Sequence, residues 1–222
     1  MKRKDIARYI LLRSIGNFLL LFALYGVGAT FGPALFYEVQ FRVEQYQGIH
    51  YVVADTTNTS TSPSLFVSGS SNQRVLVPVN TSFSIVIPKI GADAQVLANV
   101  NPANEDEYLK ALKLGVAHAK GTSLPNQNGT IYMFAHSTDN FWDVGRYNAI
   151  FYLLKDLNIG DNAIIFYNNK RYDYSVTDKK ITDPSDVSYL VNSKKTENQL
   201  VLQTCWPPGT TLKRLLVIAK PV

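Results

Sequence analysis

The chain of 222 residues contains a single cysteine, Cys205, and this scarcity excludes two kinds of small stabilised protein. One thiol cannot form an intramolecular disulfide framework, and a cysteine-rich structural zinc site needs several thiols. Charged residues are also sparse at 18% of the chain, whereas 46% of the residues are hydrophobic. This balance excludes global disorder and predicts one medium-sized globular domain with an appendage.

Most of the chain carries almost no net charge. The net charge is +5, and residues 1–13 account for +4 of it, with five basic side chains and one acidic one. The rest of the chain is therefore nearly neutral, which argues against a nucleic-acid partner. A basic N-terminal cluster is instead typical of a segment that orients a membrane span.

Charge is absent altogether from the 24 residues 14–37, whose centre reads FLLLFALYGVGATFG. As a helix they would extend roughly 36 Å, more than the bilayer core of about 30 Å. With the basic tail 1–13 before it, this segment predicts a single-pass cell-membrane protein with a cytoplasmic N-terminus and an extracytoplasmic body. A cleaved signal peptide, whose apolar region is usually about 7–15 residues, and a buried soluble helix are the alternatives.

A connecting region is predicted at 38–81, between the anchor and the folded domain. Alternating apolar residues at 37–43 are compatible with a strand or with a helix that continues out of the membrane. Ten of the seventeen residues 56–72 are Ser or Thr, a composition that cannot bury enough apolar surface to offset its ordering entropy. We therefore expect a juxtamembrane segment with a flexible linker, and a catalytic domain at 82–222.

The domain is predicted to be mainly β. Short apolar segments bounded by Gly, Pro and Asn lie at 83–90, 94–100, 129–137, 162–169, 171–181, 199–205 and 214–220. Short helices are predicted at 104–113 and 149–157, and a hairpin turn at 168–170. Six or more short strands with few helices predict a β-barrel or a β-sandwich.

Cys205 ends one of these apolar runs, directly before a Pro-Pro-Gly turn. One interpretation is a buried cysteine that packs as a small hydrophobe. The other is a nucleophile at the rim of a barrel, because an unpaired extracytoplasmic thiol is open to oxidation and needs a reason to be there. A nucleophilic thiol also needs a base and a group that stabilises developing negative charge.

The candidate base is His136, which ends an apolar strand as Cys205 does. His118 is interpreted as a structural hydrogen-bonding residue, and His50 lies before the linker, outside the domain. Arg214 follows Cys205 by nine residues, so two strands joined by a tight turn would bring it beside the thiol. A guanidinium there could lower the pKa of the thiol or hold a substrate carbonyl oxygen.

The segment VLQTC, followed by an arginine in the next strand and preceded by a strand that ends in histidine, resembles the sortase family of membrane-anchored transpeptidases. The signature of the family is Thr-Leu-any-Thr-Cys. Residues 202–205 match this signature, and Val201 replaces its first threonine. The resemblance extends over about 82–222, and GVAHAKGTSLPNQNGTIYMFAHS is similar to the stretch that leads to the catalytic histidine of the family.

The resemblance implies an eight-stranded sortase β-barrel and the catalytic residues His136, Cys205 and Arg214. It implies that Cys205 attacks an LPxTG-like sorting signal of a secreted protein and forms a thioacyl-enzyme. An amine acceptor, either a cell-wall precursor or a pilin lysine, then takes the acyl group. Thr204 and Trp206 are expected to contact the substrate, and no metal or cofactor is expected.

Two other functions remain compatible with the sequence. A cysteine peptidase would use the same residues with water in place of the amine, and a catalytically degenerate binding module would keep the barrel with an inert thiol. The acidic residues 105–107 could suggest calcium, but consecutive residues of a helix do not converge on one ion. We favour a solvated helix start for them.

Overall fold

The computed structural model describes residues 3–54, 72–137, 150–195 and 197–222. The chain divides into two compact units, Met1–Arg42 and Val43–Val222. Nearly all of the predicted Ser/Thr-rich linker lies outside the described residues. Each unit is described by itself below.

The first unit belongs to a single long helix, α1 (Arg3–Tyr46). Within α1, the 22 residues Arg8–Ala29 have a mean hydropathy of 1.8 and are unburied, so this part is long and apolar enough to cross a membrane. The alternating residues 37–43 belong to this helix and not to a strand. The last turn of α1 is part of the second unit.

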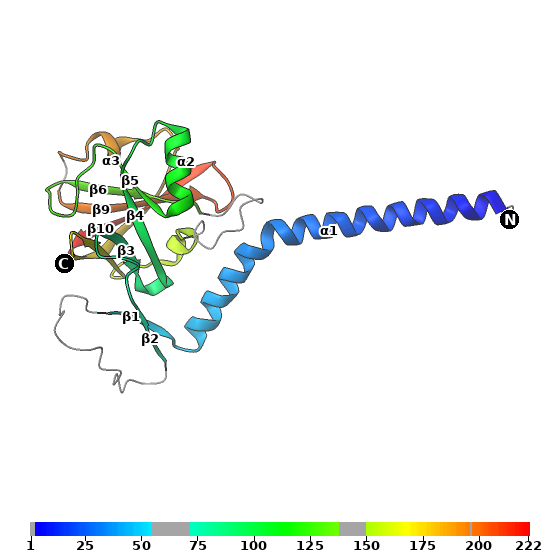
Figure 1. Ribbon diagram of the computed structural model, residues 1–222, viewed down its shortest axis with the longest axis horizontal. Helices are drawn as coiled ribbons and strands as arrows, with labels where there is room; N and C mark the ends of the chain where they lie inside the picture. The colour runs from blue at the N-terminus through cyan, green and yellow to red at the C-terminus, as the bar shows by residue number, and fades with distance from the viewer. Residues whose placement is uncertain (1–2, 55–71, 138–149, 196) are drawn as a thin grey trace. The chain divides into compact units, whose positions relative to one another are not determined.

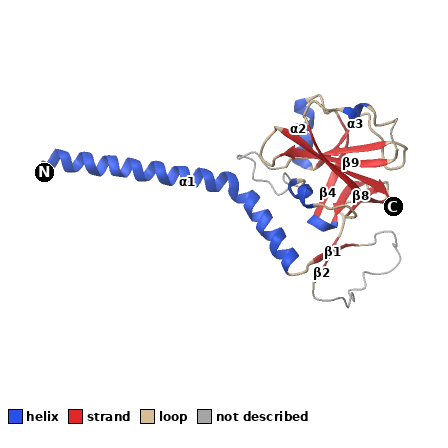
Figure 2. Cartoon of the chain, turned by 180° about the vertical axis from the view of Figure 1, so that it is seen from behind, coloured by secondary structure: helices blue, strands red, loops and turns tan. Residues whose placement is uncertain are grey.

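The second unit is built on a closed barrel of eight strands, which confirms the predicted mainly β fold (Figures 1 and 2). The strands follow one another around the barrel in the order β10-β8-β7-β3-β4-β5-β6-β9, and closure leaves no edge exposed. The pairs β4–β5 and β6–β9 are parallel and the other pairs are antiparallel. The bounds are β3 (Phe83–Ile87), β4 (Ala92–Val100), β5 (Val116–Ala119), β6 (Thr130–Phe134), β7 (Asn162–Tyr167), β8 (Lys170–Thr182), β9 (Gln199–Trp206) and β10 (Lys213–Pro221).

The barrel core consists of branched aliphatic and aromatic side chains from every part of this sheet. In β3 and β6 all five residues are buried, so these strands are covered on both faces. Double coverage explains why their sequences are almost continuously apolar instead of alternating. The large side chains with almost no exposed surface include Ile85, Ile87, Met133, Ile165, Leu200, Leu202 and Leu216. Each such burial contributes about 1.5–3 kcal/mol to folding before entropy is counted.

Short helices connect the strands. They are η1 (Pro88–Ile90), α2 (Glu105–Leu114), η2 (Tyr152–Asp156) and α3 (Ser188–Val191). The predicted strand 83–90 ends earlier, because Pro88 starts the 3-10 turn η1. The described part of the predicted helix 149–157 is likewise a 3-10 helix.

The turn between β7 and β8 is the predicted hairpin. Asn168 and Asn169 both have positive φ angles, of 49° and 59°. A two-residue hairpin of this type needs two left-handed residues, and asparagine tolerates that conformation better than most residues. The turn sets Tyr167 opposite Lys170 and so fixes the register of the β7–β8 pair.

A small parallel sheet of β1 (His50–Val53) and β2 (Gln73–Leu76) lies outside the barrel. Its residues Val53 and Leu76 pack on a buried cluster formed by Val86, Ile164 and Phe166. The packed part of the chain therefore begins before Ser82, where the sequence placed the start of the domain. His50–Val53 and Gln73–Leu76 belong to the second compact unit, with the barrel.

Polar contacts join the last turn of α1 to this small sheet and to the barrel. The Tyr51 hydroxyl donates to Glu44 at 3.0 Å, and Arg74 forms an ion pair with Glu44 at 2.9 Å. Lys89 of η1 donates to Gln45 at 2.8 Å. Glu44 is 13% exposed, so its partners compensate for the loss of hydration of a largely covered carboxylate.

Candidate active site

Cys205 and Arg214 form a cross-strand pair. In the antiparallel register of β9 and β10, Arg214 is the direct partner of Cys205. Directly opposite residues project from the same side of a sheet, with Cβ atoms about 4.5–5.5 Å apart. The turn after Cys205 therefore brings Arg214 back opposite the only cysteine of the chain, as the sequence predicted.

His136 reaches the same place from the other side of β9. The parallel register of β6 and β9 pairs Phe134 with Gln203, and the pairing continues where the Ala135 amide donates to the Gln203 carbonyl at 3.2 Å. β6 ends at Phe134, and His136 follows it by two residues. The segment that carries His136 therefore continues along β9 toward Cys205, which lies opposite Arg214 of β10.

Thr204, for which a substrate contact is predicted, makes a contact within the protein. Its side chain is 2% exposed, and its hydroxyl donates to the Ala135 carbonyl at 3.1 Å. As the neighbour of Cys205 in the strand, Thr204 projects from the opposite side of the sheet. It therefore ties β9 to the segment that carries His136. Trp206, paired with Lys213, is half-buried and follows the same alternation, so it projects from the side opposite to Cys205.

The environment of the three side chains suits proton transfer and charge stabilisation. Cys205 is a free, half-buried thiol. Burial lowers the pKa of His136, so its imidazole is mainly neutral at pH 7 and can accept a proton. Arg214 donates through Nη1 to the carbonyl groups of Thr211 and Lys213, both at 3.1 Å. These bonds hold the guanidinium beside the β9–β10 turn, and Nε and Nη2 make no other hydrogen bond to the described residues.

A further polar residue lies on β8, the other neighbour of β10. Thr182 is the direct partner of Arg214, and its hydroxyl is buried without a hydrogen-bond partner among the described residues. An unpaired buried hydroxyl costs about 1–3 kcal/mol. The sequence analysis did not select Thr182, because nothing in its local sequence reveals that β8 pairs with β10.

Four further residues near the ends of β6 and β9 contact one another in pairs, and the sequence did not predict them. The Tyr132 hydroxyl donates to Gln203, and Tyr108 of α2 packs the edge of its ring against Phe134. Gln203 lies two residues before Cys205 and Tyr132 lies four before His136. Their even spacing from the candidate residues is the signal that could have identified them.

His118 lies inside the barrel, with both ring nitrogens hydrogen-bonded. The Asn99 amide donates to Nδ1 at 3.2 Å, and Nε2 is 3.0 Å from the Ser123 carbonyl and 3.0 Å from the Thr122 hydroxyl. An amide can only donate and a carbonyl can only accept, so these partners fix the neutral tautomer protonated on Nε2. Burial lowers the pKa of His118, which keeps the ring neutral. His118 is thus a structural residue with its bonding capacity used.

Within the described ranges, no group of three His, Cys, Asp or Glu side chains is arranged to hold a metal ion. The acidic start of α2 instead contributes to its N-terminus. Asn104 accepts a hydrogen bond from the Glu107 amide at 3.2 Å, and Glu107 accepts one from the Asn101 amide at 2.9 Å. These bonds satisfy backbone donors that a helix start leaves unpaired.

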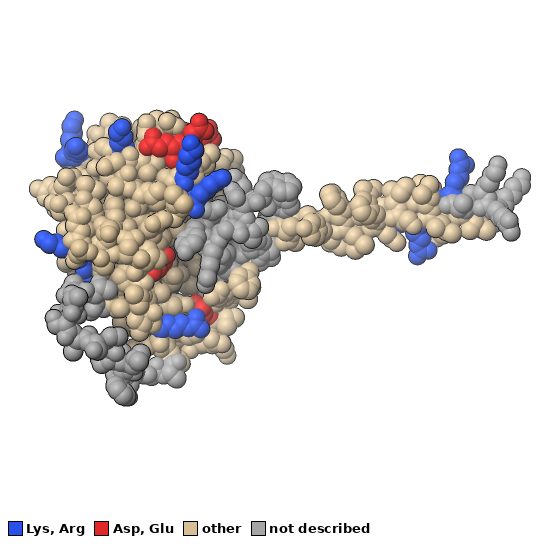
Figure 3. Space-filling model, viewed as in Figure 1, with Lys and Arg blue, Asp and Glu red and all other residues tan. Residues whose placement is uncertain are grey.

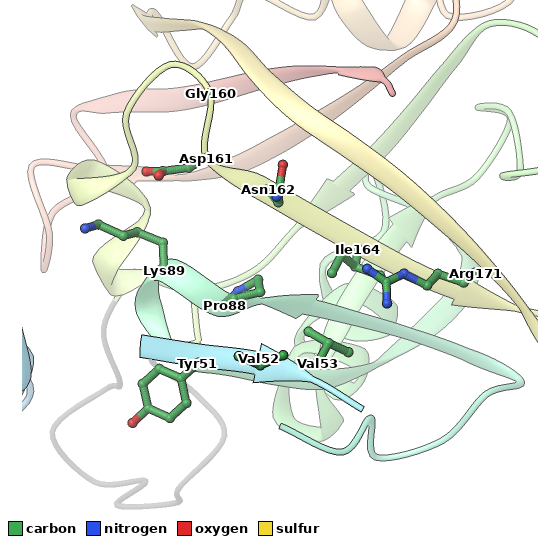
Figure 4. A pocket seen from close by; sticks show the side chains of 10 residues that line it. All are labelled: Tyr51, Val52, Val53, Pro88, Lys89, Gly160, Asp161, Asn162, Ile164 and Arg171. Carbon is green, nitrogen blue, oxygen red and sulfur yellow. The ribbon is translucent and has the colours of Figure 1, made fainter. Parts of the chain in front are cut away.

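A hollow of about 430 Å³ lies between β1, η1 and β7 (Figure 4). Its lining includes Lys89, Asp161 and Arg171 and none of the three candidate residues. These charged groups already have partners: Gln45 for Lys89, the Asn158 amide for Asp161 and Asp173 for Arg171.

The face drawn in Figure 3 carries both signs of charge over the barrel, in accord with the nearly neutral composition.

Comparison with known proteins agrees with the fold. A family model described as the sortase domain matches residues 85–222. Sortase D of Bacillus subtilis (strain 168) is 27% identical over 139 residues, and the match spans 61% of this chain and 61% of that protein. The chain thus covers less than two thirds of the length of this relative.

Solved structures give the same result. The structure of sortase A from Corynebacterium diphtheriae, in a lid mutant, matches with a TM-score of 0.52 and 25% identity over 64% of this chain and 70% of that one. A Clostridium perfringens protein described as a sortase D5 transpeptidase matches in fold, with a TM-score of 0.51 and 23% identity over 64% of this chain and 78% of that one. The matched part includes β3 to β10. The chain belongs to the sortase family, as its sequence resemblance indicated.

Proposed function

We propose that the chain is a cysteine transpeptidase that acts on a sorting signal at the cell surface. The observation that supports this proposal is the strand register, which pairs Cys205 with Arg214 and runs the segment before His136 along β9. A thiol, a neutral imidazole and a fixed guanidinium are the groups that acyl transfer through a thioester requires. Membership of the sortase family supports the same reaction class.

The first half of the reaction forms a thioester. The imidazole of His136 takes the proton of Cys205, and the thiolate attacks a backbone carbonyl carbon of the bound peptide. Arg214 donates hydrogen bonds to the carbonyl oxygen as negative charge develops on it. The C–N bond then breaks, and the imidazolium of His136 gives its proton to the leaving amine.

The second half transfers the acyl group. The incoming amine attacks the thioester carbon, and the neutral imidazole of His136 accepts the proton that the amine loses. The C–S bond breaks and Cys205 leaves as a thiolate. The acceptor we propose is an amine of a cell-wall precursor or of a pilin lysine, and the donor is a secreted protein with an LPxTG-like sorting signal.

The test is incubation of the full chain in detergent with a library of sorting-signal peptides and a small amine, followed by mass spectrometry. A transpeptidase gives the amine adduct and a trapped thioester on Cys205. Products with a new carboxyl group alone, in the presence of excess amine, would support a peptidase instead. Absence of any covalent adduct would support a binding module, and Cys205→Ala serves as the control for adduct formation elsewhere.

We also propose that residues 1–13 lie in the cytoplasm, that 14–37 anchor the chain, and that 38–81 connect this anchor to a catalytic domain at 82–222 outside the cytoplasm. The apolar helix Arg8–Ala29 supports a span, and the basic residues before the uncharged stretch support the orientation. Protease treatment of intact cells should remove the domain and leave a tag at the N-terminus protected. Protection of the domain would contradict this orientation.

A further inference from the structure

We propose that Tyr108 of α2 contacts the peptide bound at Cys205, with its hydroxyl donating a hydrogen bond to a backbone carbonyl next to the one attacked. This inference rests on the proposed function and names one further residue of the same site. It starts from the placement of α2 beside the end of β6, the strand that leads to His136.

The helix α2 is fixed at both ends, so it holds Tyr108 in a defined place. Asn104 caps its first turn, and at its end the Gln95 side chain of β4 donates to the Leu114 carbonyl at 2.9 Å. Gly115 follows the helix where a Cβ atom would lie 2.4 Å from the Gln95 carbonyl oxygen. Only glycine allows this approach, which sets the end of α2 tightly against β4.

The face of α2 that carries Tyr108 is turned toward the barrel. Ala111 and Leu112, three and four residues later, are 5% exposed, and residues at these spacings share one helix face. The Tyr108 ring lies edge-on to the Phe134 ring, with centroids 6.4 Å apart and planes at 74°. Phe134 ends β6 two residues before His136, so Tyr108 packs at the end of the strand that leads to the candidate base.

Tyr108 keeps its hydroxyl proton under physiological conditions. Burial is the main factor that raises the pKa of Tyr108, and the negative charges of Glu105 and of an ionised Cys205 act in the same direction. The positive charge of Arg214 opposes them. The phenol is therefore neutral at pH 7 and is available as a donor.

These contacts give Tyr108 a defined chemical role. Tyr108 contacts Phe134, whose partner Gln203 lies two residues before Cys205, so a peptide whose scissile carbonyl lies at Cys205 would pass close to α2. Its neighbouring carbonyl groups need donors once water has left the site. The Tyr108 hydroxyl is such a donor, held by a rigid helix, while its ring forms an apolar wall with Phe134. A positioned donor of this kind favours the reactive alignment of the peptide without acting on the thiol itself.

The experiment separates contact with the peptide from an effect on the thiol. The full chain is treated in detergent with Leu-Pro-Ala-Thr chloromethyl ketone, whose peptide part must occupy the site, and in parallel with iodoacetamide, which needs no peptide contact. Both reagents alkylate Cys205, and the ratio of the two rates is measured for the unmodified chain, Tyr108→Phe and Tyr108→Met. Tyr167→Phe is the matched control, because its ring also packs edge-on against a phenylalanine, Phe83, with centroids 5.0 Å apart and planes at 69°.

We expect both Tyr108 variants to lose about 3–10-fold in the rate with the peptidyl reagent, the equivalent of one neutral hydrogen bond. Their rates with iodoacetamide should stay within about twofold, and Tyr167→Phe should change neither rate. An equal loss with both reagents, or a loss in Tyr108→Phe no larger than in Tyr167→Phe, would overturn the inference. If the unmodified chain reacts no faster with the peptidyl reagent than with iodoacetamide, the inference is overturned too.

The same measurements keep this inference separate from the proposed function. If the unmodified chain prefers the peptidyl reagent but forms no thioester with any peptide, transpeptidation fails while the rate ratio still decides the role of Tyr108. If thioesters form normally and the ratio in Tyr108→Phe equals that of the unmodified chain, the proposed function stands and the role of Tyr108 is wrong.

Discussion

Arg214 lies directly opposite Cys205 across the antiparallel pair of β9 and β10, while its Nη1 atom is held by the carbonyl groups of Thr211 and Lys213. The turn between the strands thus has two effects. It folds the chain back so that Arg214 lies opposite Cys205, and its own carbonyl groups hold the guanidinium. The β9–β10 turn thus sets both the position of Arg214 and the orientation of its guanidinium.

Substitution of Cys205 should separate chemistry from packing. Cys205→Ala is expected to abolish the thioester, because the chain has no other thiol. The thiol is only half-buried, so the free energy of unfolding should change by no more than about 1 kcal/mol. Intact-protein mass spectrometry and urea unfolding measure the two quantities. A large loss of stability, together with a wild-type thiol that resists electrophiles, would favour the packing interpretation of the cysteine.

The two histidines of the domain should respond differently. His136→Ala is expected to lower kcat/KM by at least about 100-fold, since it removes the group that moves protons between thiol, amine and peptide. His118→Ala is the control and should keep substantial activity in the molecules that remain folded. Rates are normalised to the folded fraction, measured by circular dichroism. The reverse pattern would show that the base has been assigned to the wrong histidine.

Arg214→Lys tests whether charge alone is sufficient. Lysine keeps the positive charge but cannot reproduce the planar fork, and its single ammonium cannot both occupy the carbonyl groups of the turn and reach a substrate oxygen in the same geometry. We expect kcat to fall by about 10–100-fold, the range of one oxyanion contact or somewhat less. Steady-state kinetics with the best peptide give the value. Activity equal to that of the unmodified chain would limit the role of Arg214 to its charge.

Stability should decline as the pH falls below about 6.5. Burial lowers the pKa of His118 and His136, so below that pH the unfolded chain binds more protons than the folded one. The free energy of unfolding is therefore expected to be level above pH 6.5 and to decrease toward the lowered pKa values. His118→Asn should cost about 1–3 kcal/mol at pH 8 and show a weaker decrease between pH 7 and 5. Parallel curves for the two proteins, from urea unfolding, would exclude His118 as a source of the effect.

The small sheet outside the barrel should contribute to stability. A fragment of residues 82–222 lacks Val53 and Leu76, which cover the buried cluster of Val86, Ile164 and Phe166. Compared with a fragment of 43–222, we expect it to lose about 2–4 kcal/mol, the value of two partly buried aliphatic side chains. Chemical unfolding of both fragments measures the difference. Equal stability would support the start of the domain at Ser82.

The sequence determined the features that depend on local pattern. Apolar runs separated by turn residues gave the strand segments, the asparagine pair gave the β7–β8 hairpin, and the basic tail before an uncharged stretch gave the candidate span. The Pro-Pro-Gly turn also predicted that Arg214 would return to Cys205, because a hairpin is a local structure whose register follows from its turn.

The tertiary structure alone decided which distant strands are neighbours. β6 and β9 are parallel and lie far apart in the sequence, so no local pattern could show that the segment ending at His136 runs beside Cys205. The same holds for Thr182 opposite Arg214, for Tyr108 above Phe134, and for Val53 and Leu76 on the barrel. The contact of Thr204 also depends on tertiary structure, since its direction is set by the alternation of β9 and its hydroxyl bonds to a residue 69 positions away. Local propensity determines where strands and helices form. Barrel closure pairs residues across the whole domain, and it therefore determines which side chains lie together at the site.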